Sequence, residues 1–165
     1  MQEPPSAQID DFRWLIQDFV RRFGFLSDEA TPCGQPIPVA CAHALQLIDA
    51  QRDHALPQTA LLAHFAVDKS NVSRLVARLV DMGLANCRPD DVDRRSKWIE
   101  LTPKGARMAE KLKAGSRDRF GRLLQGIPAS KRGPVVAALG ELVRALSRMD
   151  PTFDAGATAP ATGPA

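Results

Sequence analysis

The spacing of hydrophobic and polar positions predicts a mainly helical chain. From Ile9 to Phe23, apolar side chains recur every three or four residues, as on one face of an amphipathic helix. The first eight residues, which include Pro4 and Pro5, are interpreted as a loose arm. Prolines and glycines mark a connector over 26–38, and the pattern resumes as a second helix over roughly Val39–Arg52.

Two further helices are expected in the middle of the chain. Pro57 suits the first turn of a third helix ending near Phe65, because a proline there costs no intrahelical hydrogen bond. Asp68 is a suitable N-cap for a fourth helix over Lys69–Met82, and Gly83 stands where a left-handed residue ends a helix. A short helix, a tight turn and an amphipathic helix together form a helix-turn-helix pattern.

A hairpin and two longer helices complete the predicted order. The short alternating runs Leu84–Arg88 and Lys97–Leu101 are typical of strands, with a polar tip between them. Thr102 is expected to cap a fifth helix that extends to about Gln125, and a sixth helix is expected over about Ala129–Met149. The segment 150–165, rich in alanine, proline and glycine, is expected to be disordered.

Composition narrows the class of protein. The 165 residues are 44% hydrophobic and 25% charged, which is ordinary for a globular domain. No apolar run approaches the roughly 20 residues needed to span a bilayer, and the N-terminus lacks the pattern of a secretory signal. Three scattered cysteines do not suggest a disulfide framework. A cytoplasmic protein with no membrane partner is therefore expected.

Charge is distributed unevenly along the chain. Residues 1–67 hold 4 basic and 8 acidic side chains, whereas residues 106–148 hold 10 basic and 3 acidic ones. The two ends could attract each other within a fold or across a dimer, or they could simply form solvated faces. The net charge of +3 by itself does not identify a nucleic-acid partner.

Motifs for catalysis are not found. The sequence contains no glycine-rich phosphate loop, no zinc-protease helix and no convincing pair of nucleophile and base. His43, His54 and His64 do not have the close spacing of metal ligands. We therefore expect a protein that is not an enzyme and that holds no cofactor or metal.

The fourth helix carries a candidate DNA-reading face. Its apolar stripe would pack inward, and small side chains near its start would let the opposite face enter a major groove. The candidate contacts on that face are Lys69, Ser70, Asn71, Ser73, Arg74 and Arg78. A solvated helix surface would explain any one of these residues alone. At the hairpin tip, Asp93, Arg94 and Arg95 would suit a narrow minor groove, which attracts guanidinium groups.

These motifs together resemble the MarR family of winged-helix regulators. The resemblance rests on Leu75–Leu84, on Asp93-x-Arg95 and on Leu101–Gly105, with nine residues between Asp93 and Thr102. It implies a sequence-specific regulator, with repression as the expected role, that binds a pseudo-palindromic duplex operator as a homodimer. In that reading Arg95 enters the minor groove and Asp93 orients it.

The resemblance also implies a division of the chain. Residues 1–38 would form an arm, a dimerisation helix and a connector, residues 39–105 the winged helix-turn-helix, residues 106–149 the C-terminal dimerisation helices, and 150–165 a tail. The apolar side chains at both ends independently indicate more apolar surface than a small helical unit buries. Packing of the two ends against each other within one chain is the alternative.

An effector is implied, but its identity is not. Cys33 in the connector and Cys41 at the start of the second helix are candidate sensors of oxidants, electrophiles or a soft metal ion. Cys41 shares an apolar face, so a buried core cysteine is the alternative there. A small aromatic molecule in an apolar pocket is the other candidate signal.

Three positions depart from the family pattern, and one other function stays open. Pro57 replaces a usual helix cap, Cys87 replaces a frequent basic residue, and Trp98 stands in a strand without an assigned role. The alternative function is a winged-helix module that binds proteins and not specific DNA. Steep salt dependence of DNA binding would separate the two functions.

Overall fold

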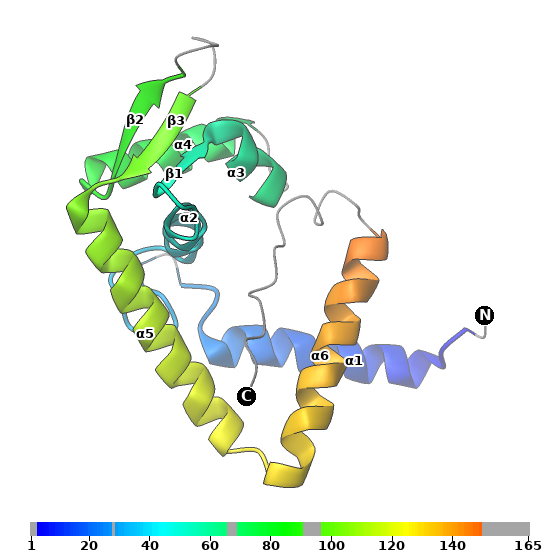
Figure 1. The fold of residues 1–165 in the computed structure, drawn as a ribbon. Coiled ribbons are helices and arrows are strands. Elements are labelled where there is room, and N and C mark those ends of the chain that lie inside the picture. Colours follow the sequence, from blue (N-terminus) through cyan, green and yellow to red (C-terminus); the bar gives the residue numbers. More distant parts are fainter. Residues whose placement is uncertain (1–2, 28, 66–68, 91–96, 150–165) are drawn as a thin grey trace.

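The computed structural model describes residues 3–27, 29–65, 69–90 and 97–149. The described residues form two parts, an upper lobe of short helices and three strands and a set of long helices below it (Figure 1). In chain order the elements are α1 (Ser6–Phe23), α2 (Val39–Asp49), β1 (Ala55–Pro57), α3 (Gln58–Phe65), α4 (Lys69–Asp81), β2 (Ala85–Pro89), β3 (Lys97–Leu101), α5 (Pro103–Gln125) and α6 (Ala129–Met149).

The core of the lobe is built around α2. Leu45 and Ile48 of this helix have no exposed surface, and they pack with Leu61 of α3 and Leu79 of α4. Ile99 of the central strand completes this cluster. The inward stripe predicted for the fourth helix is confirmed, since Val72, Val76 and Leu79 are buried and Leu75 is half-buried. On the opposite face of α4, the side chains of Ser73, Arg74 and Arg78 are exposed.

Most predicted elements are confirmed to within a few residues. The bounds of α5 and α6 agree with the prediction, and Thr102 caps α5 by accepting a hydrogen bond from the Gly105 N–H at 3.0 Å. Gly83 has a φ of +67°, the left-handed conformation expected at the end of α4. The first helix starts three residues before the predicted Ile9, at Ser6, and so includes part of the expected arm.

A third strand was not predicted. β1 pairs antiparallel with β3, so that the sheet order is β1-β3-β2 and Leu56 lies opposite Ile99. The expected position of Pro57 inside the third helix is therefore wrong, because Pro57 ends β1 and pairs with Trp98. α2 ends at Asp49, three residues before the predicted Arg52, and the chain then reaches the edge of the sheet by a turn in which His54 adopts a φ of +49°.

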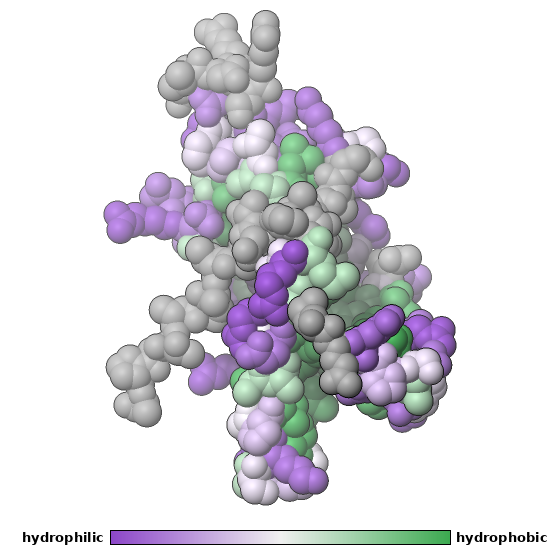
Figure 2. All heavy atoms as spheres, turned by 90° about the vertical axis from the view of Figure 1, so that its right-hand side faces the viewer, coloured by the Kyte–Doolittle hydropathy of each residue, from purple (hydrophilic) through white to green (hydrophobic). Residues whose placement is uncertain are grey.

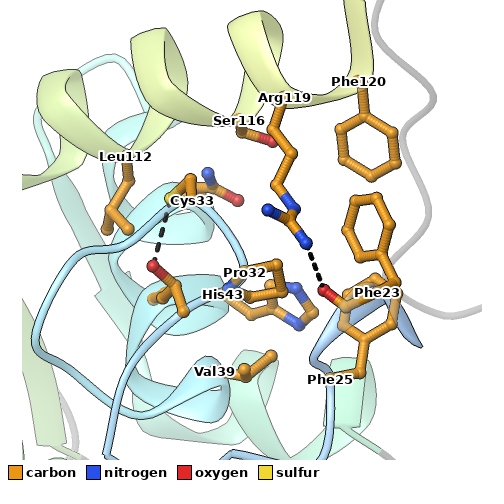
Figure 3. A pocket seen from close by; sticks show the side chains of 13 residues that line it. Phe23, Phe25, Pro32, Cys33, Val39, His43, Leu112, Ser116, Arg119 and Phe120 are labelled. Atoms are coloured by element: carbon orange, nitrogen blue, oxygen red, sulfur yellow. Dashed lines mark hydrogen bonds between the residues drawn. The ribbon is translucent and has the colours of Figure 1, made fainter. Parts of the chain in front are cut away.

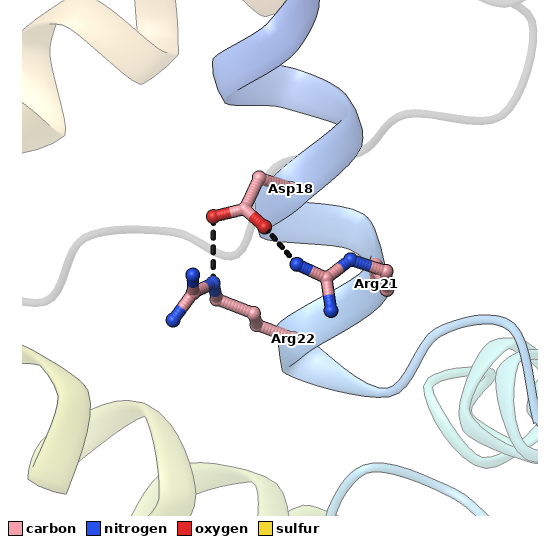
Figure 4. Close-up of polar contacts among 3 residues, drawn as sticks. All are labelled: Asp18, Arg21 and Arg22. Atoms are coloured by element: carbon pink, nitrogen blue, oxygen red, sulfur yellow. Dashed lines mark hydrogen bonds and ion pairs between the residues drawn. The ribbon is translucent and has the colours of Figure 1, made fainter.

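The long helices have little cover. α6 buries none of its residues, and α1 buries only Phe23. Near its end α1 carries an acidic side chain, Asp18, that pairs with Arg21 and with Arg22, whose Nε lies 2.6 Å from the carboxylate (Figure 4). Within the described residues, no helix combines the length and the apolar character needed to cross a bilayer.

Candidate nucleic-acid interface and adjoining cavity

The outer face of α4 presents the residues predicted to read DNA. These six side chains are all exposed and share one helix: Lys69, Ser70, Asn71, Ser73, Arg74 and Arg78. The buried stripe of α4 fixes its rotation about its own axis, and this rotation directs the polar face to solvent. Six side chains that can donate hydrogen bonds therefore lie along a surface narrow enough to enter a major groove.

Hydrogen bonds on this face orient particular side chains. The Arg74 guanidinium donates to the Asn71 side-chain oxygen at 2.8 Å and to the Ser70 hydroxyl at 3.4 Å. The Gln58 amide, at the start of α3, donates to the Ser73 hydroxyl at 3.2 Å. Gln58 was missed by sequence reasoning, because its link to α4 spans the turn of the helix-turn-helix. These bonds limit the rotamers of Arg74 and Ser73 before any partner binds.

The base of the hairpin holds Trp98, for which the sequence suggested no role. The half-buried indole donates from Nε1 to the Asp90 carboxylate. On the neighbouring strand Arg88 lies over the indole ring at 5.5 Å and pairs with Glu100. Trp98 therefore packs on the hairpin itself and stiffens the two strands that lead to the tip. Cys87 is exposed on the edge strand β2.

A short junction fixes the end of α4 to the start of α5. The Thr102 hydroxyl donates to the Gly83 carbonyl at 2.8 Å, and the Lys104 ammonium donates to the Met82 carbonyl at 2.6 Å. Gly105 approaches the backbone so closely that a Cβ there would lie 1.9 Å from the carbonyl oxygen of Leu84. The junction therefore explains the motif Leu101–Gly105, because Thr102, Lys104 and Gly105 each contribute to the contact between the end of α4 and the start of α5.

The tip of the hairpin lies outside the described residues. Asp93, Arg94 and Arg95 belong to this segment, and Asp68, the predicted cap of α4, belongs to another segment outside the described residues, 66–68. Their predicted roles stay predictions. The strands on either side of the tip are paired from Ala85 opposite Leu101 to Pro89 opposite Lys97, so the predicted hairpin is confirmed up to its last pair.

Comparison with known proteins relates part of this chain to a protein family. A family model described as MarR family matches residues 35–96, which contain α2, α3, α4 and β2. This segment belongs to the MarR family. No curated protein sequence matches the chain. The family is one of transcription regulators and not of enzymes.

Solved MarR-like structures extend the similarity over the remaining helices. A MarR-family transcriptional regulator from Rhodococcus sp. RHA1 is 27% identical, with a TM-score of 0.66 over 90% of this chain and 99% of that one. Sco3205 from Streptomyces coelicolor, solved in complex with DNA, is 18% identical, with a TM-score of 0.68 over 100% and 96%. BpsR from Bordetella bronchiseptica, whose DNA binding is regulated by 6-hydroxynicotinic acid, is 20% identical, with a TM-score of 0.62 over 84% and 93%.

Below the MarR-family lobe, a partly open cavity of about 250 Å³ lies between α2, α5 and the end of α1 (Figure 3). Three aromatic rings, those of Phe23, Phe25 and Phe120, line one side of it. Arg119 donates to the Phe23 carbonyl at 2.9 Å and stacks on the Phe23 ring at 4.8 Å. Its Nε is buried and, among the described residues, has no hydrogen-bond partner.

The two candidate sensor cysteines differ in their surroundings. Cys33 is half-buried and lines the cavity, and its Sγ lies 3.1 Å from the Thr31 hydroxyl (Figure 3). Cys41 is 1% exposed, and burial raises the pKa of its thiol, an effect that the charge of Arg78 only partly opposes. A buried, protonated thiol is a poor nucleophile. The cavity thus favours Cys33 over Cys41 as a reactive group.

Proposed function

We propose that this protein is a transcription regulator, acting as a repressor, that binds a pseudo-palindromic duplex operator as a homodimer. The observation that carries the proposal is the exposed face of α4, where polar and cationic side chains lie opposite a fully packed apolar stripe. Such a helix, supported behind by α2 and α3, has the geometry of a recognition helix in a major groove. The similarity to a DNA-bound structure, Sco3205, supports the same role.

The proposed contacts divide between two grooves. Ser70, Asn71 and Ser73 would meet base edges or nearby phosphates, while Arg74 and Arg78 would reach guanine edges or the backbone. Lys69, at the start of α4, would pair with a phosphate near the helix N-terminus. Asp93, Arg94 and Arg95 would form the minor-groove contact, with the strands stiffened by Trp98 directing them.

The dimer is proposed from the uncovered apolar surface. Side chains on α1 and α6 remain between 40% and 59% exposed, among them Phe12, Leu15, Phe19, Leu139 and Val143. Viewed from the side of α1 and α6, green apolar surface lies along the lower part of the molecule (Figure 2). Two copies that share these helices would bury a surface that a single copy leaves in water.

The cavity is proposed as the effector site. A cavity of roughly 150 Å³ is enough to hold a benzene ring, so this larger one accepts a single-ring molecule. The three rings would pack on an aromatic effector, and the Arg119 guanidinium in the cavity wall would donate to an oxygen on it. BpsR, which responds to 6-hydroxynicotinic acid, supports an effector of this type. Cys33, on the cavity wall, is the proposed site for an oxidant, an electrophile or a soft metal ion.

The DNA-binding proposal is tested by selection and substitution. Bound duplexes are first selected from a random pool, and the affinity of the best one is then measured by fluorescence anisotropy. Arg74→Ala should weaken binding by about five- to a hundredfold, because a positioned Arg–base or Arg–phosphate contact is lost. Lys131→Ala removes one charge from the exposed start of α6, away from the reading face, and should leave affinity unchanged.

Salt dependence separates this function from protein recognition. A dimer that neutralises six or more phosphates should lose roughly a thousandfold in affinity between 50 and 200 mM salt. Arg95→Ala should weaken binding and reduce the slope. A selected pool with no preferred sequence, together with unchanged binding by Arg74→Ala and Arg95→Ala, would refute DNA reading and favour the protein-binding module.

The dimer is tested on the uncovered helices. Leu139→Glu places a charge in the proposed interface and should shift the sedimentation coefficient from dimer to monomer at micromolar protein. Leu26→Glu makes the same chemical change at a connector residue that is 71% exposed, and it serves as the control. A monomeric wild-type protein at these concentrations would contradict the dimer.

A further inference from the structure

The effector cavity shares a wall with a second, open hollow. This hollow has a volume of about 670 Å³, and its lining includes Lys113 and Arg117 of α5. The two spaces have four lining residues in common, two on α2 and two on α5. These shared residues are His43, Gln46, Ser116 and Phe120. The hollow is called the basic groove below.

Helix periodicity explains why the two spaces are adjacent. Along α5 the cavity is lined at positions 112, 116, 119 and 120, and the basic groove at 113, 116, 117 and 120. Each set is a stripe with spacings of three and four residues, and the two stripes are neighbours on one helix. On α2 the cavity is lined at positions 39, 42, 43 and 46, and the groove at 43, 46, 47 and 49, with Ala50 following directly after the helix.

The two stripes differ in chemistry. The cavity side is aromatic around Arg119, whereas the groove side carries two permanent cations, Lys113 and Arg117. Neither of these cations has a carboxylate within ion-pair distance among the residues that the structure describes. The acidic residue on the groove wall, Asp49, is engaged with His54 at 3.2 Å.

We infer that the effector site continues from the cavity into the basic groove, and that its ligand joins an aromatic head to an anionic tail. The head occupies the aromatic cavity with its oxygen on Arg119. The tail crosses the shared ridge of His43 and Ser116 and ends between Lys113 and Arg117. This inference rests on the proposed effector role of the cavity and adds the chemical class of the ligand.

Helix geometry sets the length of the tail. Lys113 lies six residues before Arg119 on the same helix, which corresponds to about 9 Å along the axis. A chain of four or five carbon atoms that extends from an aromatic ring therefore has the length to carry an anion from the cavity toward Lys113. A ligand without the tail would fill the cavity and leave both groove cations in water.

The titratable groups around the tail also predict that ligand binding is coupled to the uptake of a proton. His43 lines both spaces, and the other titratable or charged residues in their walls are Asp49, His64, Lys113, Arg117 and Arg119. Burial first, and then the charge of His64, lower the pKa of His43. An anion placed beside His43 opposes this effect and favours the charged form of its imidazole. Binding of the anionic tail should therefore strengthen as pH falls from 8 to 6.

The test uses two ligands that differ only in the charge of the tail. The probes are 4-(4-carboxybutyl)benzoate and 4-pentylbenzoate, and their binding to the full-length protein is measured by isothermal titration calorimetry. The dianionic probe should bind about five- to tenfold more tightly, since two charged contacts form in a partly exposed groove. It should also take up protons on binding, as seen from heats that depend on the buffer.

Substitutions test whether the difference in affinity between the two probes arises from the basic groove. The double variant Lys113→Gln, Arg117→Gln should bind 4-pentylbenzoate as the wild type does and lose the preference for the dianion. Lys111→Gln removes a charge from an exposed position of α5 outside the groove lining and should keep the preference. Arg119→Gln should weaken both probes together.

Two results would overturn the inference, and they separate it from the proposed function. Equal affinity of the two probes, or a preference that survives in the double variant, would exclude the tail subsite while leaving the cavity as the effector site. Binding of neither probe would exclude both the subsite and the proposed aromatic effector. Operator binding is measured without either probe, so the results with the probes do not affect the test of the DNA-binding proposal.

Discussion

Replacing Gly105 with alanine should destabilise the fold, even though alanine is normally the better helix residue. Gly105 lies in the first turn of α5, where its backbone contacts the carbonyl of Leu84. An added Cβ would lie 1.9 Å from that oxygen and 2.9 Å from the carbonyl carbon. Both atoms belong to backbone that leads directly into β2, so neither can rotate away as a side chain would.

The size of the effect follows from the contact. Ordinary van der Waals contact begins near 3.4 Å, so the start of α5 must retreat by about 1.5 Å. Overpacking of this kind costs about 1–3 kcal/mol. The retreat also stretches the Thr102 bonds to Gly83 and Leu84, now 2.8 and 3.1 Å, at about 1 kcal/mol each. The higher helix propensity of alanine offsets about 1 kcal/mol of this cost, so the free energy of unfolding should fall by about 2–4 kcal/mol in total.

Equilibrium urea unfolding, followed by far-UV circular dichroism, measures this difference at a fixed protein concentration. Gly121→Ala is the control, because it makes the same change in the same helix with no atom within 4 Å of the new Cβ. The control should be neutral or more stable by up to about 1 kcal/mol. If Gly105→Ala matched the control, the close approach of α5 to Leu84 would be refuted.

Three further outcomes are expected. Iodoacetamide should label the exposed Cys87 first and Cys41 only on unfolding, because Cys41 is 1% exposed and its pKa is raised; equal rates by mass spectrometry would contradict this. Burial lowers the pKa of His43 below its ordinary 6.5, so its contribution to stability is complete above pH 6.5 and is lost as pH falls below it. His43→Gln should therefore lessen the loss of stability on acidification, and urea midpoints at pH 7.5 and 5.5 that shift as in the wild type would refute this. Trp98→Phe keeps the ring but removes the Nε1–H donor to Asp90, and should lower the unfolding free energy by about 1 kcal/mol; an unchanged urea midpoint would show that this bond contributes nothing.

The elements that the sequence predicted well are those with local causes. The apolar stripe of α4 repeats over three turns and ends at a glycine, so its position, its rotation and its exposed residues could all be read from spacing. Thr102 followed by Pro103 likewise indicates the start of α5. Local periodicity was also sufficient to expect uncovered apolar faces on the first and last helices.

Features that depend on distant partners were not predictable. β1 has three residues, includes a proline and exists through its pairing with β3, so its own sequence resembles the start of a helix. The role of Trp98 required knowing that Asp90, eight residues earlier, lies beside its indole. The cavity draws its wall from α1, the connector, α2 and α5, and Arg119 was not singled out because a lone arginine in a helix has no distinguishing spacing.

The junction between α4 and α5 turns the fifth helix into a lever. Arg119 lies fourteen residues beyond Gly105, about 21 Å along the helix axis. A tilt of about 5° at the cavity would therefore move the start of α5 by about 2 Å at that rise per residue. Because Thr102, Lys104 and Gly105 fix that start to the end of α4, α4 must move with it. In a dimer with two such levers, a small wedge beside each Arg119 would change the distance between the two reading faces.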